Sequence, residues 1–282
     1  MLVPESYAQR MSLNTWDDPL LRQILPLAEE MLECKGFSND PVGDAASGIM
    51  PGLLYKYKGR VLLFVSDRCA MHCRFCFRRN TRLPEAVDWD LVWDYIAADA
   101  SINEVILSGG DPLCLDVGLL SAHIDKAIAI PHIQTVRIHT RLPIADPDLV
   151  NEPLIEPITR IVSIKTCIVV IHANHSAELV GECAVALGKL RAAGALLLNQ
   201  SVLLKGVNDS VGALEALSHA LISHHVLPYY LHQLDRVNGA RHFEVEEKRG
   251  RKIIDELRRR LPGYAVPRYV REMAGEASKI PL

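Results

Sequence analysis

Apolar runs alternate with helical periods along most of the chain, from residue 60 to residue 260. Six runs are rich in Val, Ile and Leu with little polar alternation, which is typical of parallel strands covered on both faces. They lie at 61–65, 104–107, 135–139, 161–171, 196–203 and 227–231. The segments between and after them show the period of amphipathic helices. These lie at 89–98, 119–129, 148–152, 177–193, 212–224 and 244–260.

Repeated strand and helix units predict an α/β fold in which helices cover a parallel sheet and the connections are right-handed. Six units fit a partial (β/α)6 TIM-like barrel better than a full eight-stranded one. Residues 1–50 differ, because they combine a short helical period at 19–32 with a stretch at 36–48 rich in Gly, Asp, Ser and Pro. We therefore expect a helical lead-in and loop at 1–50 and the barrel at 51–265.

Polar side chains follow each predicted strand. In barrels of parallel strands the chemistry gathers at the carboxyl ends of the strands, so these residues are the candidates for a site. The successive ends carry Cys69, then Ser-Gly-Gly-Asp-Pro at 108–112, Arg-Ile-His-Thr-Arg at 137–141, His-Ala-Asn-His at 172–175, Asn-Gln-Ser at 199–201 and Tyr-Tyr-Leu-His-Gln-Leu-Asp at 229–235. The sequence thus predicts one polar mouth of the barrel.

Composition narrows the class of protein. A net charge of -3 with 23% charged residues argues against a general affinity for nucleic acid, which requires a basic surface. No stretch reaches the roughly 18 uninterrupted apolar residues of a membrane span, and the start lacks a signal-peptide pattern. We expect a soluble, cytoplasmic protein without membrane or direct nucleic-acid contact.

The seven cysteines do not predict a disulfide framework, because their number is odd and three of them are clustered. Four are scattered and are interpreted as packing thiols: Cys34, Cys114, Cys167 and Cys183. The other three, Cys69, Cys73 and Cys76, have the spacing C-x3-C-x2-C where an apolar strand opens into a loop. Three thiolates at this spacing can hold three irons of a four-iron cluster and leave the fourth iron open to a ligand.

The same three thiols have simpler readings: a chance cluster, a zinc site short of one ligand, or buried thiols that only pack. The arginines interleaved with them favour a functional site, because thiols that merely pack have apolar neighbours. These arginines are Arg74, Arg78 and Arg79.

Other candidates are ambiguous when the residues are considered alone. Gly109-Gly110-Asp111-Pro112 is a plain turn in most proteins, although two glycines also allow a close backbone approach to a ligand. His172 lies near other polar residues and fits a hydrogen-bonded core histidine. Lysines such as Lys279 are usually solvated, and Asp235, next to Arg236, fits a surface carboxylate.

The motif Cys69-Ala-Met-His-Cys-Arg-Phe-Cys resembles the cluster motif of radical S-adenosylmethionine (SAM) enzymes. The flanking Tyr57-Lys-Gly-Arg60 and Cys-Phe-Arg78-Arg79 narrow the resemblance to the lysine 2,3-aminomutase family. Within it the chain is most similar to the short bacterial members that supply (R)-β-lysine for modification of elongation factor P. The similarity runs from about Val3 to Leu282.

The resemblance implies three cofactors: a 4Fe-4S cluster, SAM and pyridoxal 5'-phosphate (PLP). It implies the cluster on Cys69, Cys73 and Cys76, and SAM contacts from Gly109, Gly110, Asp111, His172 and Gln200. Residues 266–282 are then a PLP-lysine segment, in which Lys279, followed by x-Pro, holds PLP as a Schiff base. Tyr57 faces the PLP ring and Arg60 binds its phosphate. The family's glycine run is only partly present, since Glu-Ala-Ser stands at 276–278.

The resemblance also implies the substrate and the reaction, an isomerisation of L-lysine to β-lysine by a 1,2-amino shift. Arg78 matches the partner of the substrate carboxylate, as a planar bidentate donor. Asp235 and Glu272 match two acidic positions that hold the ε-ammonium, with Glu272 standing where the family more often has Asp. The implied partners are a flavodoxin- or ferredoxin-type electron donor and, functionally, elongation factor P and its lysyl-ligase.

Several alternatives stay open. A radical SAM and PLP aminomutase acting on arginine or glutamate would keep both cofactors, whereas a radical SAM enzyme without PLP would not need Lys279. A zinc-binding or structural protein would need neither. The basic strips at 248–252 and 258–260 would suit the docking of a protein partner, although a solvated helix face is the more common explanation of such charge runs.

Overall fold

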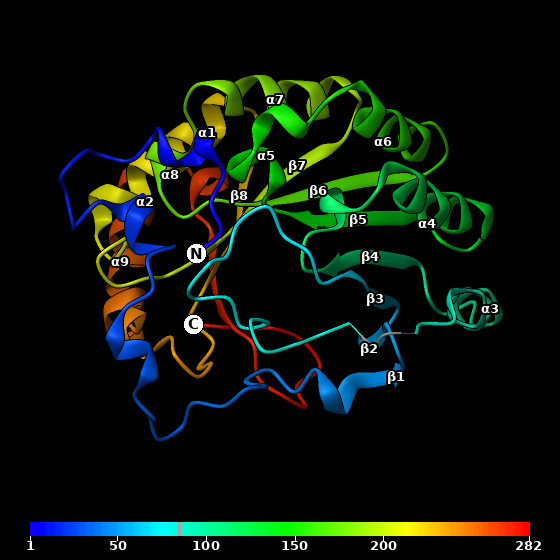
Figure 1. Ribbon diagram of the computed structural model, residues 1–282, viewed down its shortest axis with the longest axis horizontal. Coiled ribbons are helices and arrows are strands. Elements are labelled where there is room, and N and C mark those ends of the chain that lie inside the picture. The colour runs from blue at the N-terminus through cyan, green and yellow to red at the C-terminus, as the bar shows by residue number, and fades with distance from the viewer. Residues whose placement is uncertain (84–85) are drawn as a thin grey trace.

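The computed structural model describes residues 1–83 and 86–282, which form one ten-stranded sheet whose strands follow each other in chain order (Figure 1). Strands β3 to β9 run parallel, while antiparallel hairpins add β1 and β2 at one edge and β10 at the other. The strands are β1 (Gly48–Met50), β2 (Leu53–Tyr57), β3 (Arg60–Ser66), β4 (Glu104–Gly109), β5 (Thr135–Thr140), β6 (Thr166–His172), β7 (Leu196–Val202), β8 (Leu227–His232), β9 (Arg268–Arg271) and β10 (Ile280–Pro281).

Helices cover the outer side of the curved sheet, as Figure 1 shows. One long helix follows each of β3 to β8: α3 (Trp89–Ala98), α4 (Val117–Ala129), α6 (Glu152–Ile164), α7 (Glu182–Ala192), α8 (Val211–Ser223) and α9 (Glu247–Arg260). Asp88, Asp116, Asn151 and Ser210 each cap the first turn of a helix by accepting a backbone N–H. The partial barrel of six strand and helix units predicted from the sequence is confirmed, and the hairpins at both edges were not predicted.

Three predicted segments have wrong boundaries. The run at 161–171 is not all strand, because residues 161–164 end helix α6 and β6 begins at Thr166. Ile155, Ile158 and Ile161 recur every three residues and form the buried face of that helix. The predicted helix at 148–152 is instead a 3-10 turn, η4 (Pro147–Leu149), followed by the start of α6. The predicted helix at 177–193 is split into η5 (Ser176–Glu178) and α7, since Gly181 between them has a φ of 62°.

The N-terminal segment packs against the barrel although little of it is helical. It contains α1 (Glu5–Ala8), α2 (Pro19–Arg22), η1 (Ala28–Met31) and η2 (Ala45–Ser47). The helical period at 19–32 therefore produces two short turns rather than one helix. Tyr7, Leu20 and Ile24 are fully buried and belong to the main hydrophobic cluster, so this segment contributes to the core.

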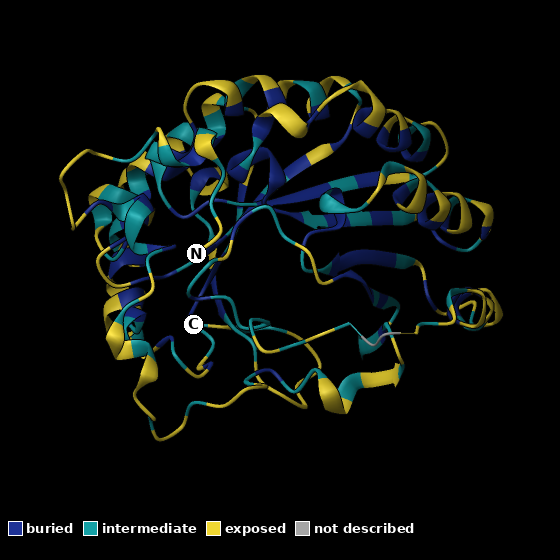
Figure 2. Cartoon of the chain, viewed as in Figure 1, coloured by how far each residue is buried: buried dark blue, intermediate teal, exposed yellow. Residues whose placement is uncertain are grey.

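The core lies between the sheet and its helices. Figure 2 shows the strands largely buried and the outer helix surfaces exposed, as amphipathic helices require. A second small cluster around Phe75, Leu234 and Phe243 lies beside the mouth of the barrel. Within the described ranges, no helix is long and apolar enough to cross a bilayer.

Candidate active site

One pocket at the carboxyl ends of the parallel strands is lined by every residue that the family resemblance assigns to a cofactor or to the substrate. From the amino-terminal half of the barrel come Tyr57, Arg60, Cys69, Cys73, Cys76, Arg78, Gly109, Gly110 and Asp111. From the other half come His172, Gln200, Asp235, Glu272 and Lys279. Residues more than 200 positions apart in sequence thus share one cavity, because parallel strands bring their carboxyl ends to the same mouth.

The cysteine loop leaves β3 and is stabilised by ion pairs. Arg74 and Arg79 both bind the Glu30 carboxylate of η1, Arg79 at 2.8 Å. Glu30 is partly buried, yet these two guanidinium groups keep its pKa below the usual value. Two of the three arginines in the cysteine motif therefore position the loop, and Arg78 alone of the three lines the pocket.

The three cysteines are each partly buried. Burial raises the pKa of Cys69 well above the usual range and that of Cys76 to about 11. Thiols in such surroundings become thiolates when a metal replaces their protons. Among the residues that the structure describes, no three His, Cys, Asp or Glu side chains converge as ligands of a single ion would. A four-iron cluster does not need that convergence, because each thiolate binds a different iron.

Gly109 and Gly110 pack directly against the start of the cysteine loop. Gly109 has a φ of 119°, and a Cβ there would collide with the Ser66 carbonyl oxygen. A Cβ at Gly110 would collide with the carbonyl oxygen of Arg68, which accepts a 2.7 Å hydrogen bond from the Asp111 N–H. Only glycine fits both positions, so this turn holds the cysteine loop close to β4.

Asp111 is buried and its carboxylate is fully engaged by the protein. It accepts hydrogen bonds from the Thr140 hydroxyl at 2.7 Å and from the backbone N–H groups of Arg141, Leu142 and Leu113. The side chain therefore joins the ends of β4 and β5, and any contact with a ligand falls to the backbone of its turn.

His172 is the last residue of β6, and Gln200 lies opposite it on β7, two residues before that strand ends. The imidazole of His172 stacks on Phe75 of the cysteine loop, with ring centroids 5.5 Å apart. Burial, with a smaller contribution from Arg141, lowers the pKa of His172 to about 3, so its ring is neutral at pH 7.

Lys279 and Glu272 face each other across the β9–β10 hairpin. The Lys279 ammonium donates to a Glu272 carboxylate oxygen. This pairing follows from the hairpin register, in which Ile280 lies opposite Arg271. Nearby, the Arg60 guanidinium lies over the Tyr57 ring, 4.9 Å from its centroid. The Tyr57 hydroxyl is buried and has no hydrogen-bond partner in residues 1–83 and 86–282.

An alternating chain of charges connects Arg78 with Lys279. The Arg78 Nε donates to Asp44 at 3.0 Å, and the other Asp44 oxygen accepts from the Lys56 ammonium at 3.2 Å. Lys56 also donates to Glu272 at 2.8 Å, whose second oxygen accepts from Lys279. Each charge therefore has an opposite neighbour before any ligand binds.

Asp235 lies apart from this chain. Burial and the charge of Glu272 raise its pKa to about 7, whereas Lys279 and Lys56 bring that of Glu272 down to about 2 despite burial. The pocket thus contains two carboxylates near Lys279 with opposite shifts, which favours an added positive charge beside Asp235.

Several residues that line the pocket received no individual role from the sequence. Asp44 lies in a stretch interpreted only as loop, and Lys56 precedes Tyr57 in a quoted motif but received no role. His139, His232 and Arg141 follow predicted strands, and that position alone was the signal that could have identified them.

The residues present fit the groups that the cysteine motif and Lys279 suggest. Three thiols on one loop are the donor set of a cluster with an open iron. The orphaned Tyr57 hydroxyl, the adjacent Arg60 and the lysine at 279 fit an anionic aromatic ring such as that of PLP.

Comparison with solved structures first identifies the fold. A radical SAM methyltransferase from Sphaerobacter thermophilus superposes with a TM-score of 0.51 at 20% identity, covering 77% of this chain and 68% of that one. The fold is therefore the partial barrel of radical SAM enzymes. No protein-family model matches the chain.

Curated relatives then identify the family. The chain is 44% identical to L-lysine 2,3-aminomutase of Escherichia coli over 99% of its own length and 82% of that protein. It is 39% identical to the enzyme of that name from Haemophilus influenzae and 34% identical to that of Clostridium subterminale, of which it covers 82% and 68%. The chain belongs to the L-lysine 2,3-aminomutase family. Membership implies an isomerase that uses a 4Fe-4S cluster, SAM and PLP.

Proposed function

We propose that this protein converts L-lysine to β-lysine by moving the amino group from C2 to C3. The observation that supports the proposal is the single pocket in which three thiols, the lysine at 279 and opposite charges for both ends of lysine lie together. An enzyme that must bring two cofactors and a substrate into contact requires such convergence.

When bound, the cluster with SAM supplies a carbon radical that removes hydrogen, and PLP supplies the conjugated system on which an amino group migrates. The protein's own contribution is binding, orientation and exclusion of water. We assign the cluster to Cys69, Cys73 and Cys76, and the PLP carbonyl carbon to Lys279. SAM is assigned to the turn at 109–111 with His172 and Gln200, and the PLP ring and phosphate to Tyr57 and Arg60.

The substrate is assigned by charge. Arg78 offers the substrate carboxylate a guanidinium that already binds a carboxylate, Asp44. Glu272 already binds two ammonium groups, those of Lys56 and Lys279. The ε-ammonium of lysine has the same chemistry, and Asp235 adds a second anion. The side-chain carboxylate of glutamate would lie beside Asp235 and Glu272, and repulsion among the three negative charges opposes its binding. Arginine, whose far end is also a cation, is the second candidate.

The biological role is proposed from the resemblance of the motifs to short bacterial members of the family. There the product is (R)-β-lysine, which a ligase attaches to elongation factor P, and the electron comes from a flavodoxin or ferredoxin. We extend these roles to this chain, with a lead-in at 1–50, the barrel at 51–265 and the PLP-lysine segment at 266–282.

The direct test is anaerobic incubation of the iron-loaded protein with SAM, PLP, a low-potential reductant and L-lysine, followed by chiral analysis of the products. β-Lysine is expected, with less turnover of arginine and none of glutamate. Absence of β-lysine from a preparation with a full complement of iron and PLP would refute the assignment of the substrate.

A second test addresses PLP alone. Lys279→Ala is expected to lose the near-visible absorbance of bound PLP, whereas Lys58→Ala, which removes an exposed lysine outside the pocket, is expected to retain it. Unchanged absorbance in Lys279→Ala would favour a radical SAM enzyme in which Lys279 does not hold PLP.

A further inference from the structure

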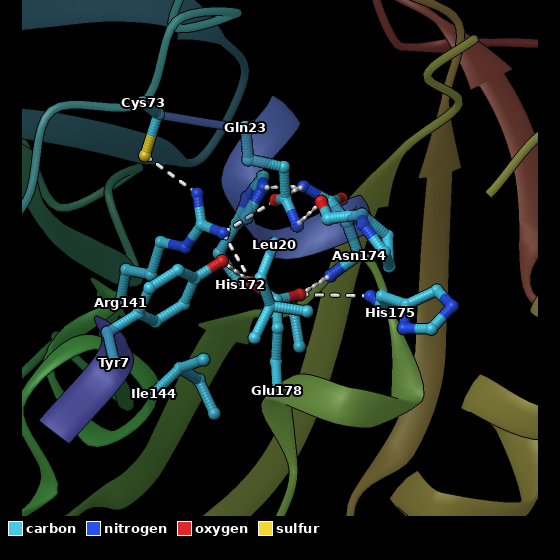
Figure 3. Close-up of polar contacts among 12 residues, drawn as sticks. Tyr7, Leu20, Gln23, Cys73, Arg141, Ile144, His172, Asn174, His175 and Glu178 are labelled. Atoms are coloured by element: carbon cyan, nitrogen blue, oxygen red, sulfur yellow. Dashed lines mark hydrogen bonds and ion pairs between the residues drawn. The ribbon is translucent and has the colours of Figure 1, made fainter. Parts of the chain in front are cut away.

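Arg141 is a buried cation that contacts a cysteine of the cluster motif. Its guanidinium donates to the Cys73 Sγ at 2.7 Å and lines the pocket. Figure 3 shows the group between Cys73 and a polar network below it. The residue is 8% exposed, and an arginine is rarely buried unless it is paired.

A network of fully buried groups fixes the position of this guanidinium. One nitrogen donates to Glu178 at 2.5 Å and to the Gln23 amide oxygen at 2.7 Å (Figure 3). Glu178 also accepts from the Tyr7 hydroxyl at 2.8 Å and from the backbone N–H groups of Asn174 and His175. The carboxylate is thereby rigidly placed on the side of Arg141 away from the sulfur.

The N-terminal segment completes the arrangement from the other side. Gln23 accepts from Arg141 with its side chain and from the Arg74 N–H of the cysteine loop with its backbone, at 2.8 Å. The Leu2 carbonyl oxygen accepts from the His72 N–H in the same loop at 3.1 Å. Gln23 and Glu178 therefore hold the Arg141 guanidinium, while Gln23 and Leu2 hold the loop that carries the Cys73 sulfur.

The Arg141–Glu178 pair is oriented with its positive end toward the sulfur. Hydrogen bonds to cluster sulfurs and nearby positive charge raise the reduction potential of an iron-sulfur cluster, because reduction adds one negative charge to it. We propose that Arg141 is a positioning residue that raises the reduction potential of the cluster through its hydrogen bond to Cys73. The proposal rests on the assignment of the cluster to Cys69, Cys73 and Cys76.

The reaction measured is transfer of one electron from a low-potential reductant, such as Ti(III) citrate, to the oxidised cluster; no bond forms or breaks. The midpoint potential is measured by spectroscopic titration of anaerobically reconstituted protein without SAM, PLP or lysine. The result is thus independent of the substrate. Iron content of the wild-type protein separates failure of the cluster assignment from failure of this proposal.

Arg141→Met is expected to shift the midpoint to more negative potential, and Arg141→Lys to shift it less. Glu178→Gln, which removes the opposing negative charge, is expected to shift it to more positive potential. The matched control is Arg137→Met on β5, the strand that directly precedes Arg141, since Arg137 is paired with Glu104 and is not bonded to a thiol in the described chain.

Equal midpoints in wild type and Arg141→Met, with equal iron content, would overturn the proposal. So would a shift of the same size in Arg137→Met, because the effect would then be one of net charge only. Loss of iron from both Arg141 variants, with iron retained in the control, would also overturn it by making Arg141 structural.

Discussion

Glu272 and Asp235 show how one pocket gives two carboxylates different tasks. Glu272 has two ammonium partners, so its charge is retained even in acid. Asp235 is at least as deeply buried, and burial together with the nearby negative charge of Glu272 raises its pKa to about 7. Paired groups whose environments separate their pKa values are a common mark of active sites. Under the proposed function, Asp235 is the group that makes lysine binding sensitive to pH.

The KM for lysine is expected to rise as the pH falls below about 7, because protonation removes the Asp235 charge that attracts the ε-ammonium. In Asp235→Asn, KM is expected to stay near the raised value that wild type reaches in acid and to lose this dependence on pH. Steady-state kinetics between pH 6 and 9 measure both effects. A wild-type KM that is flat across pH 7 would contradict the assignment.

The same carboxyl group affects stability. Its pKa in the folded protein, about 7, lies above the roughly 3.9 of an unfolded aspartate, so the folded state binds more protons between these values. Stability contributed by the neutral form is therefore full below about pH 4 and is lost as the pH rises through 7. Asp235→Asn is expected to melt above wild type at pH 8, with a difference that disappears near pH 4. Thermal unfolding of cofactor-free protein at both pH values measures it.

At the scale of elements, two glycines inside helices have opposite surroundings. Gly250 in α9 lies against Tyr269 of β9, whose hydroxyl a Cβ would meet, whereas Gly188 in α7 is exposed and has nothing near that position. The first glycine lets a helix approach the sheet edge that carries Glu272. The second only weakens its helix.

Gly250→Ala is expected to destabilise the fold by about 1–3 kcal/mol through overpacking. Gly188→Ala is expected to stabilise it by up to about 1 kcal/mol, since alanine is the better helix former. Chemical denaturation of the two variants side by side gives both signs. Equal effects would show that α9 packs against β9 differently.

The elements that could be predicted from the sequence are those with a strong period and a cap. The helix at 89–98 was placed correctly, because its apolar spacing and Asp88 agree. Ile161 and Ile164, which end α6, fall within the predicted strand at 161–171, since short apolar runs fit both states until the caps are considered. The hairpins β1–β2 and β9–β10 were missed, because strands of two to five residues have no clear period.

For the whole molecule, the sequence predicts which residues lie at the mouth of the barrel but not which of them contact each other. Residues that follow parallel strands converge by topology, so Cys69, Asp235 and the turn at 109–111 could be expected to meet. The contacts of Lys56 with Asp44 and of Arg141 with Cys73 depend on loops and on the N-terminal segment, which carry no periodic signal. Tertiary packing alone determines them.

Cluster loading is expected to stabilise the whole fold. The cysteine loop bonds to η1 and to Leu2 and Gln23 of the N-terminal segment, so a metal that fixes the loop also stabilises these contacts. Anaerobically reconstituted protein is expected to have a higher Tm than the iron-free form, and a chelator is expected to abolish the difference. The triple variant Cys69→Ser, Cys73→Ser and Cys76→Ser serves as the control, and its Tm is expected not to rise on reconstitution.

The β9–β10 hairpin fixes the position of Lys279 independently of the exposed residues at its tip. Residues 273–278 at its tip are exposed, while the two register pairs, Ile280 with Arg271 and Pro281 with Val270, fix where the strand returns. Insertions or replacements at the tip leave that return point unchanged. This stretch can therefore diverge during evolution, or be redesigned, without rebuilding the barrel.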